Sequence, residues 1–431
     1  MTIDSPEGDS PDSANTGPSE NKRPEATART DKRPRGAADR VVRTHRQTRP
    51  TVAITVFAMA AAFGAWALGG SSWVAIHLMA AVGLVTIISG VSLMLTVTWS
   101  AAPAPPDAAV LVQRFCIAIG AVAVIAGRHF DVGAPVVVPG AALYLTGLAL
   151  LAALLALTVR RGVERRYDPA VIAYVAALCA GCAGVVVGTV MALDGSTPAR
   201  VDTHITLNVL GLVGLVVVGT LPFFTATVGR SRMAPKATAS RIVTVVAWQS
   251  VAVAVISTAM STQRAPVAAA GLAAYGVGLV AVLALLPRPT RRQLQWAGPR
   301  LIAIWAGTLW WAVAVVASAV LVGSDGHATF SPQWVWTLVV AGYGQILWGS
   351  LAYLMAVLRG GGHRLLAEGF AATRSWLGLV AANLTGVALA TSQPKIAAAT
   401  TTVWLADTAW RAARVGFGRR ALTGEHGNQE R

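Results

Sequence analysis

Long apolar runs constrain the fold of this chain more than any other feature of its sequence. The hydrophobic residues, 55% of the 431, are gathered into segments of roughly 17 to 25 residues, the length a helix needs to cross a bilayer. Lipid offers the backbone no hydrogen-bond partners, so such segments fold as helices. We therefore predict an all-α polytopic membrane protein with about twelve transmembrane helices, at 51–69, 73–97, 109–127, 134–158, 170–193, 203–226, 242–260, 265–286, 301–322, 333–357, 376–392 and 396–413.

The basic residues between these spans predict the topology. Short cytoplasmic loops of membrane proteins retain Lys and Arg, whereas translocated loops lose them. The loops after the fourth, sixth, eighth and tenth spans are rich in basic residues: Arg160, Arg161, Arg165, Arg166, Arg230, Arg232, Lys236, Arg241, Arg288, Arg291, Arg292, Arg300, Arg359, Arg364 and Arg374. The opposite loops carry only Arg128, Arg200, Arg264 and Lys395. This bias predicts a multi-pass protein of the cytoplasmic (inner) membrane with both termini in the cytoplasm.

The charge and the two ends of the chain fit the same plan. The net charge of +16 follows from the basic loops, so we expect membrane lipids rather than nucleic acid as the counterions. Residues 1–50 are rich in Pro, Ser and charged residues, which predicts a disordered cytoplasmic tail. Residues 51–415 would form the transmembrane helical domain, and residues 416–431 a short basic cytoplasmic tail.

Two histidines are the main candidates for a functional site. His77 lies in the first turns of the span 73–97, and His204 lies in the first turns of the span 203–226. Both spans are predicted to run inward, so both side chains would lie near the outer face. A histidine close to hydrocarbon is costly unless it has a partner, and haem iron or copper is a natural one. The alternative for each is a histidine that only forms hydrogen bonds. Asn208 shares a helical face with His204.

Other polar side chains are weaker candidates. Gln345 lies in the middle of the span 333–357 and needs a polar partner there. Cys179 and Cys182 form a CxxC motif whose thiols could bind copper(I), although small buried cysteines often only pack between helices. His129 lies in an outer loop. The first eleven spans hold no Asp or Glu in their interiors, which argues against a carboxylate-driven proton pump.

Several segments together resemble a known family. They are WVAIHL, TWSAAPAPP followed by QRF, DTHITLNVLGLVGLVVVGTLPFF with its exit RSRM, and GYGQILWGSLAY. They resemble the membrane domain of actinobacterial copper oxidase or nitrite-reductase-like proteins, a group related to NnrS-type haem and copper membrane proteins and distantly to the catalytic subunit of haem-copper oxidases. The resemblance implies a twelve-helix, pseudo-threefold, oxidase-like bundle, with metal ligands on the second, sixth, seventh and tenth helices.

The sequence matches only part of that family's ligand set. His77 and His204 stand on the second and sixth spans, but the seventh and tenth spans lack the family's histidines. The resemblance therefore implies one haem b, or one copper ion with Asn208 or a methionine assisting, held by His77 and His204. Related copper oxidases often continue into cupredoxin domains, so a separate redox or cupredoxin partner is implied here.

The sequence leaves three functions open. The first is a haem- or copper-binding membrane protein that serves redox reactions, metal handling or the response to nitrogen oxides. The second is a metal-free transporter or permease in which His77, His204 and Gln345 line a polar pathway. The third is a membrane scaffold or assembly factor whose partners dock on the arginine-rich loops.

Overall fold

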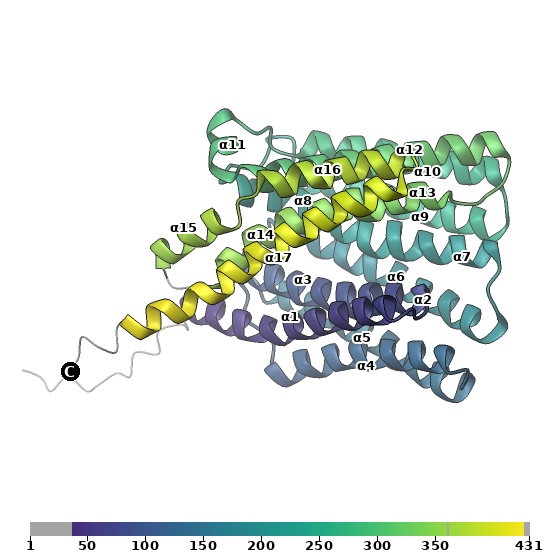
Figure 1. Ribbon diagram of the computed structural model, residues 1–431, viewed down its shortest axis with the longest axis horizontal. Helices are drawn as coiled ribbons and strands as arrows, with labels where there is room; N and C mark the ends of the chain where they lie inside the picture. The colour runs from purple at the N-terminus through teal and green to yellow at the C-terminus, as the bar shows by residue number, and fades with distance from the viewer. Residues whose placement is uncertain (1–36, 360–361, 426–431) are drawn as a thin grey trace, which may run out of the picture. The chain divides into compact units, whose positions relative to one another are not determined.

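The computed structural model describes residues 37–359 and 362–425, and their regular structure is helical throughout (Figure 1). Three of the spans are interrupted by a π-helical segment, which we label η. The elements are α1 (Ala37–Ala67), α2 (Ser72–His77), η1 (Leu78–Leu84), α3 (Val85–Trp99), α4 (Asp107–His129), α5 (Ala134–Arg160), α6 (Asp168–Asp194), α7 (Pro198–Ile205), η2 (Thr206–Val213), α8 (Gly214–Gly229), α9 (Ala239–Ser261), α10 (Ala265–Leu285), α11 (Arg291–Ala297), α12 (Pro299–Asp325), α13 (Pro332–Trp336), η3 (Thr337–Gly344), α14 (Gln345–Arg359), α15 (Gly362–Ala372), α16 (Trp376–Ala390) and α17 (Pro394–Glu425).

Ten helices in the described part of the chain are long and apolar enough to cross a membrane, and they coincide with the first ten predicted spans. The prediction of an all-helical, multi-pass membrane protein is confirmed at this level. The eleventh predicted span corresponds to α16, an apolar helix of 15 residues. The twelfth falls in the first half of α17. A membrane crossing by these last two helices stays a prediction.

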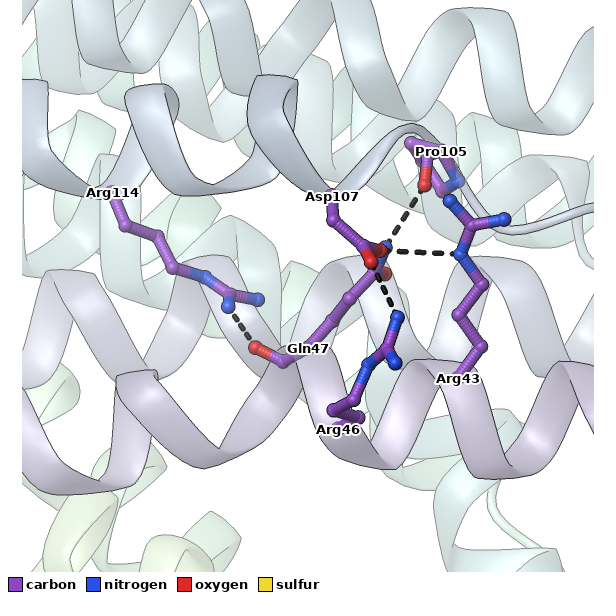
Figure 2. Close-up of polar contacts among 6 residues, drawn as sticks. All are labelled: Arg43, Arg46, Gln47, Pro105, Asp107 and Arg114. Atoms are coloured by element: carbon purple, nitrogen blue, oxygen red, sulfur yellow. Dashed lines mark hydrogen bonds and ion pairs between the residues drawn. The ribbon is translucent and has the colours of Figure 1, made fainter.

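The first helix begins earlier than the sequence predicted. Residues 37–50 were assigned to a disordered tail, but they form the start of α1. Asp107, which follows a proline-rich turn and begins α4, accepts from Arg43 Nε at 3.1 Å and from Arg46 Nη2 at 2.5 Å (Figure 2). Gln47 Nε2 donates to Asp107 at 2.6 Å and to the Pro105 carbonyl at 2.9 Å. These tertiary contacts fix a polar segment whose composition alone suggests disorder. The rest of the predicted tail, 1–36, lies outside the described residues.

Arg114 extends this contact into the bundle. Its side chain is only 2% exposed, and its guanidinium donates to the carbonyl of Gln47 (Figure 2). That carbonyl lies in the helical turn just before Pro50. Because proline has no backbone N–H, this turn of α1 has one hydrogen-bond donor fewer than a regular helix. The start of α1 is therefore joined to α4 by both a charged cluster and a buried arginine. At the other end of the chain, α17 continues to Glu425, and residues 426–431 of the predicted basic tail lie outside the described residues.

The helices repeat one pattern of contacts three times. Each unit consists of a first helix, an interrupted span, and two further helices: α1 to α5, α6 to α10, and α12 to α17 without the short α15. In each unit the π-helical segment packs against the first and third helices, as η1 does with α1 and α4, η2 with α6 and α9, and η3 with α12 and α16. The third and fourth helices of each unit also pack together. The two histidines belong to corresponding spans of the first two units.

Tyrosines from neighbouring helices satisfy carbonyls of the π-helical segments. Tyr144 Oη on α5 donates to the Ala81 carbonyl at 3.2 Å, and Tyr275 Oη on α10 donates to the Leu210 carbonyl at 3.0 Å. Both tyrosines lie on the fourth helix of their unit. Tyr343 Oη on η3 donates to a third carbonyl of this kind, that of Val209, at 2.9 Å. Because irregular backbone in a membrane needs such partners, these bonds hold the interrupted spans in place.

Candidate functional site

The structure brings His77 and His204 together, although they are 127 positions apart in the sequence. The centroids of the two imidazole rings lie 6.3 Å apart, and the ring planes differ by 28°. His77 ends α2 and His204 is the next-to-last residue of α7. Given the rise of an α-helix, each lies about 8 to 9 Å from the start of its span. His77 directly precedes a π-helical segment, and His204 lies one residue before one. π-helical turns are frequent at functional sites.

Hydrogen bonds fix the proton position on both rings. Nδ1 of His77 lies 2.7 Å from the carbonyl oxygen of Trp73, and Nδ1 of His204 lies 2.9 Å from that of Gly184. A carbonyl can only accept, so a neutral ring must carry its proton on Nδ1. Within the described part of the chain, neither Nε2 has a hydrogen-bond partner. Each ring thus keeps one free nitrogen lone pair, the form in which histidine binds metals.

The walls of the site are an indole ring and the backbone of α6. The ring of Trp73 lies against His77, with centroids 4.2 Å apart and planes tilted by 33°. On the other side, a Cβ placed on Gly188 would lie 2.9 Å from Cε1 of His204. A Cβ on Gly184 would collide with the side-chain amide of Asn208. Only glycine at these two positions lets α6 approach the histidine helix this closely.

Asn208 lies on the Nδ1 side of His204. Its Nδ2 donates to the carbonyl of His204 at 2.9 Å and lies 3.3 Å from Nδ1 of the same residue. Since Nδ1 already gives its proton to Gly184, the bond to the carbonyl is the one that holds the amide. The prediction that Asn208 shares a face with His204 agrees with this geometry. Its position suits a residue that orients the ring more than one that ligates a metal.

Gln345 belongs to a different cluster. Its side chain is fully buried at the start of α14. Its Oε1 accepts from Nδ2 of Asn383 at 3.2 Å, and Asn383 Oδ1 accepts from Nε1 of Trp310 at 3.0 Å. Nε2 of Gln345 has no partner among the described residues. This polar chain links α12, α14 and α16 and has no contact with the histidine pair in the described residues.

The remaining predicted residues lie apart from the pair. Cys179 is exposed, and Cys182 is half-buried among residues of the main core; both are free thiols on α6. His129 is exposed at the end of α4, with its ring 4.8 Å from that of Phe130. Across residues 37–359 and 362–425, no three His, Cys, Asp or Glu side chains come together in a way that could hold a metal ion.

The sequence analysis missed an acidic residue near the site. Asp202 was placed outside the span, but the structure includes it in the span Pro198–Gly229 and leaves it only 4% exposed. Its Oδ1 accepts from the backbone nitrogen of Phe330 at 3.3 Å, while Oδ2 is without a partner in the described structure. The statement that the first eleven spans hold no interior carboxylate was therefore wrong for this helix. Asp202 ties α7 to the loop before α13.

The two rings are close enough to serve one metal ion. With a metal–nitrogen bond of about 2 Å and roughly 1 Å from nitrogen to ring centroid, two imidazoles bound to the same metal have centroids at most about 6 Å apart, close to the observed 6.3 Å. A haem would need only His77 and His204 from the protein, because the macrocycle itself would hold its iron. Zinc takes three or four protein ligands, and no third ligand lies near the pair in the described part.

No protein-family model matches the chain, and no curated protein is significantly similar to it in sequence. The case for a function therefore depends on the geometry of the histidine pair and on the helical membrane fold.

Proposed function

We propose that this chain is a membrane electron-transfer protein that holds one haem b between His77 and His204. The observation that carries the proposal is the pair itself: two imidazoles from separate spans, 6.3 Å apart, each with Nδ1 bonded to a backbone carbonyl and Nε2 free. Two further features support it. The helices repeat a four-helix unit three times, as in the oxidase-like bundle that the sequence resembles, and the site lies in the first turns of apolar spans.

Haem is a better candidate than copper at this site. Copper(II) prefers a square-planar or tetragonal set of donors, so two imidazoles alone would leave its site incomplete. Asn208 faces the Nδ1 edge of His204, away from the free nitrogen. The thiols of Cys179 and Cys182 are five and two residues from Gly184 in sequence but have no contact with either ring in the described residues. A metal that brings its own equatorial ligands avoids this shortage.

The residues around the pair would tune the site in definite ways. The carbonyls of Trp73 and Gly184 hold each ring in one tautomer and one orientation, and such outer bonds also make Nε2 more basic. Asn208 would keep the backbone of His204 in place. The ring of Trp73 would cover one side of His77 and exclude water. When bound, haem would supply a reversible one-electron iron couple.

The proposal also includes the orientation and a partner. We infer from the basic loops that the site is on the outer side of a cytoplasmic membrane, with both termini inside. Electrons would then pass to or from a separate redox protein, such as a cupredoxin, on that side. Fusion of a cytoplasm-dependent reporter to the C-terminus tests the orientation, because an inactive reporter at normal expression levels would contradict it.

The direct test is a reduced-minus-oxidised visible spectrum with metal analysis on the purified full-length protein. We expect one haem per chain in the native protein, and loss of its low-spin signal in both His77→Ala and His204→Ala. His129→Ala is the matched control, because this histidine is exposed and lies away from the pair, and it should keep the signal. Asn208→Ala should retain a weakened signal. A native protein without haem would refute the proposal, and copper in its place would show that the metal was assigned incorrectly.

A further inference from the structure

A cavity lies at the opposite end of the span that carries His204. It has a volume of about 230 Å³, and its main lining residues are Arg166, Tyr167, Phe223, Thr227, Ser231 and Arg232. These come from the turn between α5 and α6, from the last turns of α8, and from the loop that follows α8. The space is large enough to hold a small polar group.

Two guanidinium groups give this cavity its charge. Arg166 and Arg232 are both exposed and both line it. Neither forms an ion pair in the described part of the chain, and the nearby carboxylate of Asp168 lies 3.8 Å from Arg165 instead. Each arginine therefore offers several N–H donors in a planar fork, the arrangement that binds phosphate best. A bound anion would balance the charge of these two arginines.

The floor of the cavity is aromatic. Tyr167 and Phe223 line it, and Trp99 packs against both. The ring centroids are 5.3 Å apart for Trp99 and Tyr167, 5.6 Å for Trp99 and Phe223, and 5.1 Å for Tyr167 and Phe223. Aromatic side chains of this kind gather where the headgroups of a bilayer meet its hydrocarbon. The cavity thus has cations at its mouth and rings below, at the ends of membrane-spanning helices.

We propose that this cavity binds the phosphate group of an anionic phospholipid. The two arginines would hold the phosphate, and the aromatic floor would contact the upper part of an acyl chain. The hydroxyls of Thr227 and Ser231 already donate to backbone carbonyls, at 2.9 and 3.4 Å. The two arginines and the hydroxyl of Tyr167 are therefore the side-chain donors left for an anion in the described lining. A soluble phosphate compound has the same charged group, but it has no use for the aromatic floor. This inference does not depend on the haem proposal.

The test compares two pairs of substitutions in the full-length protein. The first pair is Arg166→Gln with Arg232→Gln. The matched control is Arg288→Gln with Arg292→Gln, because these two exposed arginines lie between α10 and α12 and do not line the cavity. The proteins are placed in phosphatidylcholine nanodiscs, and binding of added phosphatidylglycerol is measured by native mass spectrometry. A hydrogen bond from a guanidinium group to phosphate contributes about 1.5 kcal/mol or more, so the first pair should weaken binding at least about a hundredfold. The control pair removes only general charge attraction, so it should weaken binding at most about thirtyfold.

Each other outcome has a definite meaning. Equal weakening by both pairs would show general charge attraction and overturn the local site. Equal binding of phosphatidylglycerol and phosphatidylcholine by the native protein would also overturn it. Displacement of the lipid by millimolar inorganic phosphate would replace a lipid with a soluble phosphate as the occupant. If the glutamine pair fails to fold, Arg166→Lys with Arg232→Lys keeps the charge and removes the forked donors, and it should still weaken binding.

Discussion

A methyl group on Gly188 should weaken the histidine site although neither proposed ligand is substituted. In Gly188→Ala the new Cβ would lie 2.9 Å from Cε1 and 3.1 Å from Nδ1 of His204, whereas ordinary contacts begin at 3.4 Å. The ring, or the whole of α6, must therefore move by about 0.5 Å, which is the tolerance of a working ligand site. The ring cannot easily turn away, because its Nδ1 is held by the Gly184 carbonyl at 2.9 Å.

We expect two measurable effects of this substitution. Overpacking of a buried contact lowers the free energy of unfolding by about 1–3 kcal/mol. Loss of orientation of a metal-binding histidine lowers metal affinity by about 10–100-fold. The assays are thermal unfolding in detergent and titration of the haem-free protein with haem. Gly276→Ala is the control, since its Cβ would meet Val316 at an ordinary 3.4 Å. If Gly188→Ala binds haem as tightly as the native protein while His204→Ala does not bind it, then the ring is not packed as described and the reasoning fails.

Three further predictions concern the bundle. Tyr275→Phe removes the donor to the buried Leu210 carbonyl and should lower the free energy of unfolding by about 1–3 kcal/mol, measured by thermal unfolding; an unchanged midpoint would contradict the bond. Gly214→Ala would collide with the hydroxyl of Tyr275 and should destabilise by a similar 1–3 kcal/mol, in contrast to Gly276→Ala in the same assay. Asp107→Asn leaves the arginines of α1 without their carboxylate, so amide hydrogen exchange in residues 42–50 should speed up while the other spans stay unchanged; uniform exchange across the chain would argue against a local contact.

The first ten spans could be predicted because their length follows from bilayer thickness. A run of about 20 apolar residues has one outcome in lipid. The meeting of His77 and His204 could not be predicted. Histidines near the starts of two separate helices can face any neighbour, and the choice depends on packing among many helices of similar composition. The carbonyl of Gly184 is chemically like any other, so nothing in the sequence marks it as a partner of His204.

The sequence indicated three other features of the structure only weakly or misleadingly: the close approach to α6, the repeat of helical units and the start of α1. Gly184 and Gly188 are four residues apart and so share one face of α6, which indicates close approach but not what approaches. Tyr144 and Tyr275 occur in matching patterns, with a glycine four residues before and three residues after each, and this repeat marks corresponding helices of two units. The start of α1 was misjudged because its composition is polar. Its order comes from Asp107, some sixty residues later, and local propensity cannot show such a partner.

The link between Arg43 and Asp107 also constrains how the protein is made. The two residues are separated by 64 positions, so at about 5–20 residues per second the ribosome needs about 3 to 13 seconds to supply the second after the first. During that interval the first hydrophobic segment is already in the insertion machinery, while the polar turns before it have nothing to anchor them. The first crossing must therefore be oriented by its own flanking charges, and its final register is set only when α4 emerges. Early steps of biogenesis would then tolerate changes at Asp107 that the finished protein does not.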